Sequence, residues 1–251
     1  MNTYESLKND LIQLGIRPTD VIKIHSSMKK IGDTFGGGDT VLDVFCDYLG
    51  DAGMVILPCH TWGNIQNYDY TFHLDIPSNL GLLPNLFRIR KNVHRSLHPT
   101  HSVCAFGKKA EAFVQDPLNH VITHPKTSCY GKLMDYNAKI LLIGVTLTSN
   151  TFFHFIEEQF FGPVPHWYTT ELVDFFIKLP DGTVVPDPLY CSKIVSSEYF
   201  DRAMDAVLQE PSTVTGKFGQ ADCILMDCQK IYPVITKLLA EHPRIFLDEK
   251  V

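Results

Sequence analysis

The chain lacks any apolar run that approaches the roughly 20 residues needed to cross a bilayer. Its polar start, Met-Asn-Thr-Tyr-Glu-Ser, also lacks the basic and apolar regions of a secretory signal peptide. With 45% hydrophobic and 20% charged residues, the composition is that of a folded globular protein and argues against disorder. We therefore expect a cytoplasmic protein that has no membrane partner.

The cysteines and the net charge argue against two further classes of protein. The seven cysteines include no CxxC pair, and their odd number and scatter argue against a disulfide framework. The formal net charge is −6, and Arg88-Ile-Arg-Lys91 is the only basic run, which argues against nucleic-acid binding. No linker, repeat or low-complexity tract interrupts the sequence, so we expect one domain over residues 1–251.

Helix and strand patterns alternate along the chain. Helical spacing covers 4–14, 40–49 and 83–91, and short apolar strands cover 21–25, 54–58, 101–105 and 139–144. This order predicts an α/β fold with a mixed, largely parallel central sheet flanked by helices. Farther along, Asp181-Gly182 between two apolar segments predicts a hairpin, and helices over 197–208 and 229–240 predict an α+β elaboration.

The most informative segment is a buried strand, a polar loop and a helix that carries His154, Glu157 and Glu158. Residues three and four apart share a helix face, so either glutamate can hydrogen-bond the imidazole and fix its tautomer. The helix dipole opposes protonation of His154 and the glutamate favours it, which suits a general base near neutral pH. The alternative is a surface histidine beside two solvated glutamates, but the apolar residues around His154 favour a buried pair.

Two further motifs are weaker. His25-Ser-Ser27 ends a predicted strand and is followed by Gly36-Gly-Gly-Asp-Thr40, whose N–H groups could bind a phosphate or a carbonyl, although a simple turn and helix cap explain the same residues. In Arg95-Ser-Leu-His-Pro-Thr-His-Ser102 the proline prevents the two histidines from sharing a helix face, so spacing does not support zinc. Nothing near Cys129 lowers its pKa, which disfavours a cysteine nucleophile.

Taken in order, several segments resemble the aminoglycoside 3-N-acetyltransferase family, also called the antibiotic N-acetyltransferase family. The resemblance covers about residues 20 to 160 and departs from the family pattern at Cys129, Phe155 and Ile156. The matching segments are Ile24-His-Ser-Ser27, Gly37-Gly-Asp-Thr-Val41, Leu57-Pro58 with Thr61-Trp62, Pro77-Ser78 with Gly81-Leu-Leu-Pro84, Arg95 to Ser102, Tyr130-Gly-Lys-Leu133, Ile143-Gly-Val145 and Asn150 to Glu157.

The resemblance implies acetyl transfer from acetyl-coenzyme A to a primary amine of an aminoglycoside, an amino sugar or a related small amine. It implies a reaction without a metal or an acyl-enzyme, and a link to antibiotic resistance. Residues 1–160 would form the cofactor-binding and catalytic core, and 161–251 would form the acceptor pocket. The resemblance leaves open whether the protein is a homodimer. His154 and Glu157 match the catalytic pair. The implied coenzyme A site is His25, Ser26, Ser27, Gly37, Gly38, Asp39, Thr40, Arg95, Ser96, His98, Ser102 and Tyr130, and the implied acceptor site is Trp62, Glu158 and His166.

Two other functions stay open. One is a zinc-dependent hydrolase that uses His60, His98 or His101. The other is a non-catalytic module that binds coenzyme A or a sugar, which a ligand would stabilise without any turnover.

Overall fold

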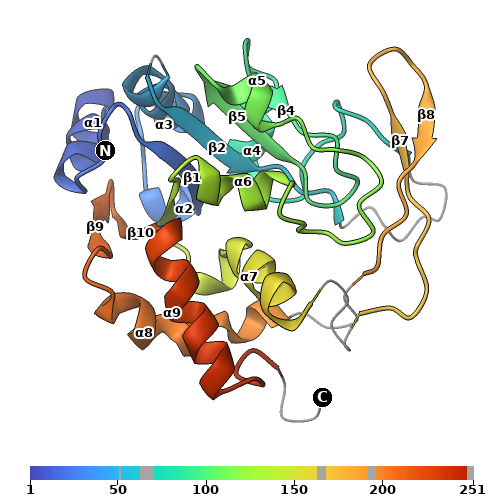
Figure 1. Ribbon diagram of the computed structural model, residues 1–251. Coiled ribbons are helices and arrows are strands. Elements are labelled where there is room, and N and C mark those ends of the chain that lie inside the picture. The colour runs from blue at the N-terminus through green and yellow to red at the C-terminus, as the bar shows by residue number, and fades with distance from the viewer. Residues whose placement is uncertain (51, 63–70, 163–167, 192–195, 248–251) are drawn as a thin grey trace.

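Three parallel strands form the centre of the fold. The computed structural model describes residues 1–50, 52–62, 71–162, 168–191 and 196–247 (Figure 1). Within these residues β2 (Met54–Pro58), β1 (Val21–Ser26) and β6 (Lys139–Ile143) pair in parallel, with β1 in the middle. Antiparallel strands extend the sheet at both edges: β5 (Val103–Gly107) and β4 (His94–Arg95) beyond β2, and β10 (Ala221–Asp227) and β9 (Val214–Phe218) beyond β6. The predicted mixed sheet flanked by helices is confirmed.

Helices cover both faces of this sheet (Figure 1). One apolar cluster joins the sheet to α1 (Tyr4–Gln13), α3 (Gly37–Leu49) and α4 (Leu82–Phe87). The other joins it to α5 (Ala110–Phe113), α6 (Cys129–Asp135), α7 (Phe152–Phe161), α8 (Met204–Gln209) and α9 (Cys228–Glu241). The described residues also include the helical turn α2 (Met28–Ile31) and the 3-10 helices η2 (Leu147–Ser149) and η3 (Ser196–Ala203).

One buried face of the central strand β1 carries ionisable side chains. Successive side chains of a strand point to opposite faces, and Ile22 and Ile24 pack with α3 in the first cluster. Lys23 and His25 therefore point to the other face, which α6 and α9 cover. Both side chains are buried, so the sequence places two ionisable groups where a central strand ordinarily carries apolar residues.

A second, small sheet lies apart from the main one. It consists of β3 (Thr71–Phe72), β7 (Phe176–Lys178) and β8 (Val184–Pro186), and its own apolar cluster contains Phe72 and Ile177. The predicted hairpin is confirmed: β7 and β8 are antiparallel, and Gly182 takes a positive φ of 90° in the turn between them.

Two predictions of local structure are wrong. The helix expected over 83–91 ends at Phe87, because the chain tightens into a short turn and Asn92 then takes a positive φ of 63°. The basic run therefore lies beyond the helix, where Arg90 binds Asp39 and Asp43 of α3. The strand expected from His101 begins only at Val103, since residues 98–101 form a turn.

The described helices all fall short of the length and apolarity that a bilayer-spanning helix requires.

Candidate active site

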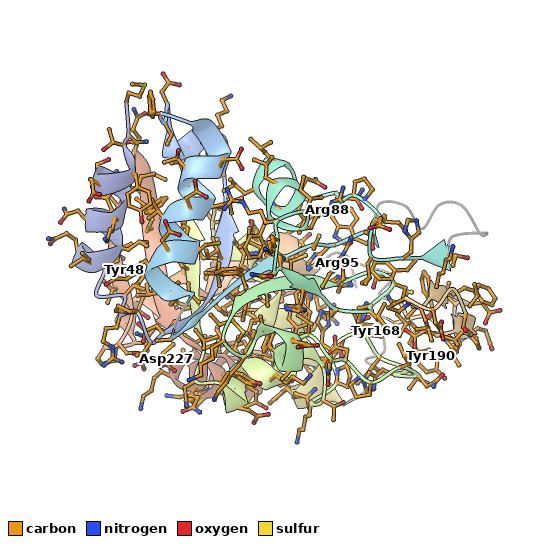
Figure 2. All side chains as sticks on the ribbon, turned by 90° about the horizontal axis from the view of Figure 1, so that it is seen from above. Tyr48, Arg88, Arg95, Tyr168, Tyr190 and Asp227 are labelled. Atoms are coloured by element: carbon orange, nitrogen blue, oxygen red, sulfur yellow. The ribbon has the colours of Figure 1, made fainter. Side chains whose placement is uncertain are left out.

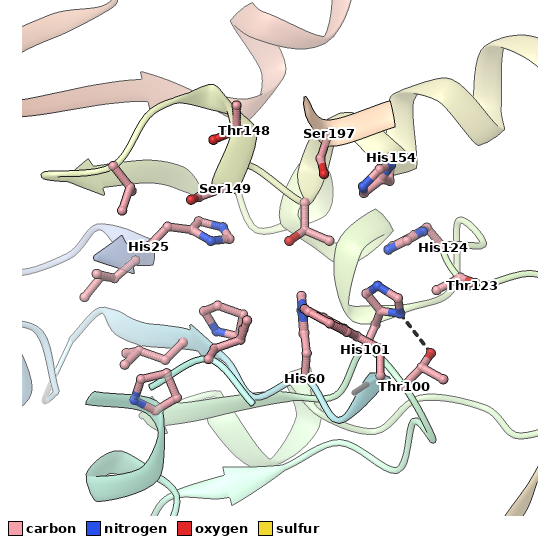
Figure 3. Close-up of a pocket in the computed structure, with 18 of the residues that line it drawn as sticks. His25, His60, Thr100, His101, Thr123, His124, Thr148, Ser149, His154 and Ser197 are labelled. Atoms are coloured by element: carbon pink, nitrogen blue, oxygen red, sulfur yellow. Dashed lines mark hydrogen bonds between the residues drawn. The ribbon is translucent and has the colours of Figure 1, made fainter. Parts of the chain in front are cut away.

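A pocket of about 540 Å³ opens at the carboxyl ends of the three parallel strands (Figure 3). Ligands of α/β proteins commonly bind at this edge, because the loops that leave the strands converge there. Imidazole, hydroxyl and aliphatic groups dominate the wall. The described residues that line it are Ile24, His25, Ser26, Leu57, Pro58, His60, Trp62, Leu80, Pro84, Thr100, His101, Thr123, His124, Val145, Thr148, Ser149, Thr151, His154, Tyr168, Cys191 and Ser197.

His154 lies in the first turn of α7 and faces this pocket (Figure 3). Its Nδ1 lies 2.9 Å from Oε2 of Glu157, one helical turn later, and its side chain is 25% exposed. The hydroxyl of Ser196 donates to the same carboxylate oxygen at 3.0 Å. Glu157 is itself buried, so an Nδ1–H group bonded to this carboxylate leaves the lone pair of His154 on Nε2.

The neighbouring glutamate binds a different histidine. Glu158 accepts a hydrogen bond from the backbone N–H of His124 and lies 2.8 Å from its Nδ1, and the hydroxyl of Tyr168 donates to it at 2.6 Å. Burial raises the pKa of Glu158 to about 7. The rings of His124 and His154 stack with centroids 5.8 Å apart, so α7 orients two adjacent imidazoles through two adjacent carboxyl groups. Of the two glutamates that the sequence offers as partners of His154, Glu157 is therefore the one in contact with it.

Tyr130 connects the remaining histidines beneath the pocket. Its hydroxyl lies 2.7 Å from Nε2 of His60, and its ring is nearly perpendicular to that of His124, with centroids 4.6 Å apart. His60 in turn packs on His101 at 4.7 Å, and the hydroxyl of Thr100 lies 2.8 Å from Nδ1 of His101 (Figure 3). The result is a contiguous group of imidazoles on one wall.

These imidazoles are held neutral. Burial lowers the pKa of His60, His101 and His124 well below the ordinary value, and the positive charge that neighbouring histidines and Lys23 would present lowers each of them further. Burial and Lys23 do the same to His25, whose Nε2 has no partner among the described residues. Neutral imidazoles can both donate and accept hydrogen bonds, which suits hydroxyl-bearing ligands.

The Arg95 to Ser102 segment builds the fold around the site. Arg95, which is labelled in Figure 2, donates to the carbonyl oxygens of Leu74 and Ile76, which follow β3, and of Cys59, which follows β2. Ser96 accepts from the N–H of Val103, and Ser102 donates to Cys59.

His98 holds the turn that presents Thr100 and His101. Its Nδ1 accepts from the N–H groups of both residues, and its Nε2 lies 3.1 Å from the carbonyl oxygen of Thr123. Both ring nitrogens are therefore used within the fold, and burial lowers the pKa of His98 to about 4. His98 therefore has a structural role in this turn.

The structure places four of the sequence-predicted site residues in the described pocket wall: His25, Ser26, Trp62 and His154. Glu157, Glu158 and Tyr130 lie behind this wall, in contact with its histidines. The other predicted residues lie outside the described wall. They are Ser27, Arg95, Ser96, His98, Ser102 and the first turn of α3. In that turn Gly37, Gly38 and Thr40 begin the helix, and Asp39 binds Arg90. His166 is outside the described residues.

Sequence reasoning missed several wall residues. His124, Thr123 and Ser197 carry no local motif: the partner of His124 lies 34 residues away in the chain and that of Thr123 lies 25 residues away. The sequence suggests a role for His60 and His101 only as candidate zinc ligands. Among the described residues, no group of three or more histidine, cysteine, aspartate or glutamate side chains has an arrangement that could hold a metal ion.

A family model described as Aminoglycoside 3-N-acetyltransferase matches residues 24–240. The chain belongs to this family. Aminoglycoside N(3)-acetyltransferase IX of Micromonospora chalcea is 29% identical over 62% of this chain and 61% of its own length. The chain spans about three fifths of the length of such curated relatives.

Solved structures of this acetyltransferase family share the whole fold. The apoenzyme of aminoglycoside acetyltransferase AAC(3)-IVa has a TM-score of 0.84 and 25% identity, over 98% of this chain and 92% of that one. A binary complex of AAC-IIIb with CoASH has a TM-score of 0.79 and 21% identity, over 95% and 96% of the two chains. The likeness extends through β9 and β10, well beyond the segment that the sequence motifs cover.

Proposed function

We propose that this protein transfers the acetyl group of acetyl-coenzyme A to the primary amine of an aminoglycoside, an amino sugar or a related small amine. The observation that carries the proposal is the His154–Glu157 pair at the pocket, with Nδ1 held by a buried carboxylate and the Nε2 lone pair left to act as a base. Membership of the family supports acetyl transfer. The structural neighbour solved with CoASH supports coenzyme A as the co-substrate.

The chemistry follows from the protonation states. An ammonium group must lose a proton before its nitrogen can attack a thioester, and Nε2 of His154 accepts that proton. The nitrogen then bonds to the carbonyl carbon and releases a second proton to water, the carbon–sulfur bond breaks, and the coenzyme A thiolate leaves and takes the first proton from the imidazolium. Glu157 stabilises the transient imidazolium. Such a base contributes about 10²–10⁴ in rate.

The same pocket contains groups that suit the thioester and its pantetheine arm. Ser26 at the end of β1 and Ser149 in η2 offer hydroxyl groups, and the imidazole of His25 lines the same pocket (Figure 3). A donor aimed at the carbonyl oxygen would stabilise the charge that develops there during attack. Holding the amine and the thioester together in one pocket lowers the barrier further by removing the entropy cost of their encounter.

Free-thiol release from acetyl-coenzyme A tests the proposal, measured across a panel of aminoglycosides, amino sugars and simple amines. We expect release with at least one amine and a loss of about 10²-fold or more in His154→Ala. His242→Ala is the matched control, because it removes an exposed histidine at the end of α9 and should leave turnover unchanged. Near-full turnover in His154→Ala would exclude His154 as the base, and no release with any amine would contradict the proposed function.

A further inference from the structure

A serine from the later part of the chain contacts the His154–Glu157 pair. Ser196 begins η3, 39 residues after Glu157, and is 2% exposed. Its hydroxyl donates to Oε2 of Glu157 at 3.0 Å, and the same oxygen lies 2.9 Å from Nδ1 of His154. The hydroxyl oxygen lies 3.3 Å from that Nδ1. The three polar atoms therefore lie within hydrogen-bond distance of one another.

One arrangement of protons satisfies these three atoms. An ionised carboxylate only accepts, so the N–H group of the imidazole and the O–H group of the serine can both be directed at Oε2. Hydrogen bonds to an ionised group are also the stronger ones. If the serine donated to Nδ1 instead, the imidazole would carry its proton on Nε2 and would lose the lone pair that the proposed reaction needs. A hydroxyl bonded to Glu157 therefore supports the productive tautomer of His154.

The described residues give the carboxylate of Glu157 few other contacts. Glu157 is 3% exposed, and its second oxygen, Oε1, is buried without a hydrogen-bond partner among the described residues. The terminal torsion of a glutamate has only broad preferences, so a carboxylate held by a single bond can turn about it. The bond from Ser196 fixes Oε2 relative to Nδ1 of His154, and it stays available after the imidazole has taken up a proton.

The helix that carries this serine also packs against the imidazole itself. The ring centroid of Phe200 lies 4.8 Å from that of His154, and the buried Phe200 packs in turn on Phe153 of α7 at 5.3 Å. Ser197, which follows Ser196, lines the pocket together with His154 (Figure 3). One short helix therefore supplies a polar contact to the carboxylate, an apolar contact to the ring and part of the pocket wall.

We propose that Ser196 is a positioning residue for acetyl transfer, which acts through Glu157 and fixes the tautomer and orientation of His154. This inference rests on the proposed function. Ser196 is not part of the described pocket wall, so we assign it no contact with either substrate. Its loss should therefore slow the chemical step without weakening the binding of the substrates.

The test is the steady-state rate of thiol release from acetyl-coenzyme A in Ser196→Ala and Ser196→Cys, with the best amine of the panel. Alanine removes the donor, and cysteine fills the same space with a much weaker donor. We expect kcat to fall by about tenfold in both variants, the effect of losing one hydrogen bond to a charged group, with KM nearly unchanged. Ser212→Ala is the matched control: this exposed serine donates to Glu210 at 3.0 Å, between α8 and β9, and its loss should leave kcat unchanged.

A double-mutant cycle shows whether Ser196 acts through Glu157. Glu157→Gln lacks the carboxylate charge that the serine stabilises in place, so adding Ser196→Ala to it should lower kcat by a much smaller factor than in the wild type. A serine that served only to pack η3 would lower kcat by the same factor in both backgrounds.

Each outcome bears on one claim. Full kcat in a folded variant of either kind, or full additivity with Glu157→Gln, would overturn the role of Ser196 and leave acetyl transfer standing. A cooperative melting transition confirms that a variant is folded, and the cysteine variant keeps the test available if Ser196→Ala does not fold. Absence of thiol release from the wild type with every amine would contradict the proposed function itself.

Discussion

Glu157 and Glu158 are adjacent in the sequence but hold different histidines, so their substitution should have different effects. Glutamine at 157 removes the charge that stabilises the imidazolium and can present its NH₂ group to Nδ1, which favours the wrong tautomer of His154. We expect kcat to fall by about 10²-fold or more in Glu157→Gln. Steady-state kinetics with the best amine of the panel checks this.

Glu158→Gln is the paired control for this prediction. Because burial raises the pKa of Glu158 to about 7, a neutral side chain at this position resembles a state that the native carboxyl already populates. Its partner His124 lines the pocket, so the change should act on KM more than on kcat. Equal losses of kcat in the two variants would contradict separate roles for the two glutamates.

At the residue scale, the spacing of partners decides what the sequence can predict. His154 and Glu157 are three residues apart on one helix, and the sequence alone places them in contact. His124 and Glu158 are separated by 34 residues, and Lys23 meets Tyr130 only after the sheet and α6 have formed. No local pattern marks such pairs, because the fold brings them together.

At the scale of elements, the cap of α9 offers a test of local stability. Asp227 ends β10 and caps the helix, since its carboxylate accepts hydrogen bonds from the N–H groups of Gln229 and Lys230 (Figure 2). Asp227→Ala leaves both groups unsatisfied, and we expect the free energy of unfolding to fall by about 1 kcal/mol. Urea unfolding measures the change.

Asp222 provides the control for the cap, because it lies on the same strand. It is 89% exposed and pairs with Lys217 on the surface, an interaction worth at most about 1 kcal/mol and commonly much less. Asp222→Ala should therefore leave the midpoint of unfolding nearly unchanged. If the two variants lost the same stability, the side chain of Asp227 would not be acting as a cap.

The elements also differ in how well their patterns predict them. β2 and β6 are continuous apolar runs, which predict buried strands without reference to the rest of the chain, and the predicted bounds agree closely with the structure. β9 was missed because it is a largely exposed edge strand with polar residues, and β10 because helices were expected on either side of it. The assignment of Arg95 and Ser102 to the coenzyme A site stays a prediction; both side chains also hold loops together through hydrogen bonds, a role that residue type and order do not reveal.

At the scale of the whole molecule, the charge of the surface and that of the pocket act at different stages. A net charge of −6 attracts cations during diffusion and raises their rate of encounter in low salt. The buried groups act only after the ligand has entered, when water no longer screens them. Net charge alone is therefore a weak guide to the substrate.

Five buried histidines in and around the pocket should also make the stability of the molecule depend on pH. Each of the five has a pKa below its unfolded value of about 6.5, so the unfolded chain binds more protons than the folded one as the pH falls below this value. Their contribution is present above about pH 6.5 and is lost at lower pH; for His98 the loss continues to about pH 4. The histidines concerned are His25, His60, His98, His101 and His124.

Two buried carboxyl groups act in the opposite direction. Burial raises the pKa of Glu158 to about 7 and that of Asp116 to about 6, so their contribution to stability is present at low pH and is lost as the pH rises through these values. Five histidines outweigh two carboxyls between pH 6.5 and 5. We therefore expect the free energy of unfolding to fall steadily from pH 7 to pH 5, as measured by urea unfolding.

His98→Asn isolates one histidine of this group. Each proton taken up on unfolding adds a slope of up to about 1.4 kcal/mol per pH unit, so the variant should lose about that much slope between pH 6 and pH 5, whatever its stability at pH 7. The slope is the readout because an asparagine also alters the turn, which shifts the whole curve without changing its pH dependence. A wild-type stability that stays constant or rises from pH 7 to pH 5 would mean that the imidazoles are not held neutral, and the base at His154 would then stand beside charged neighbours.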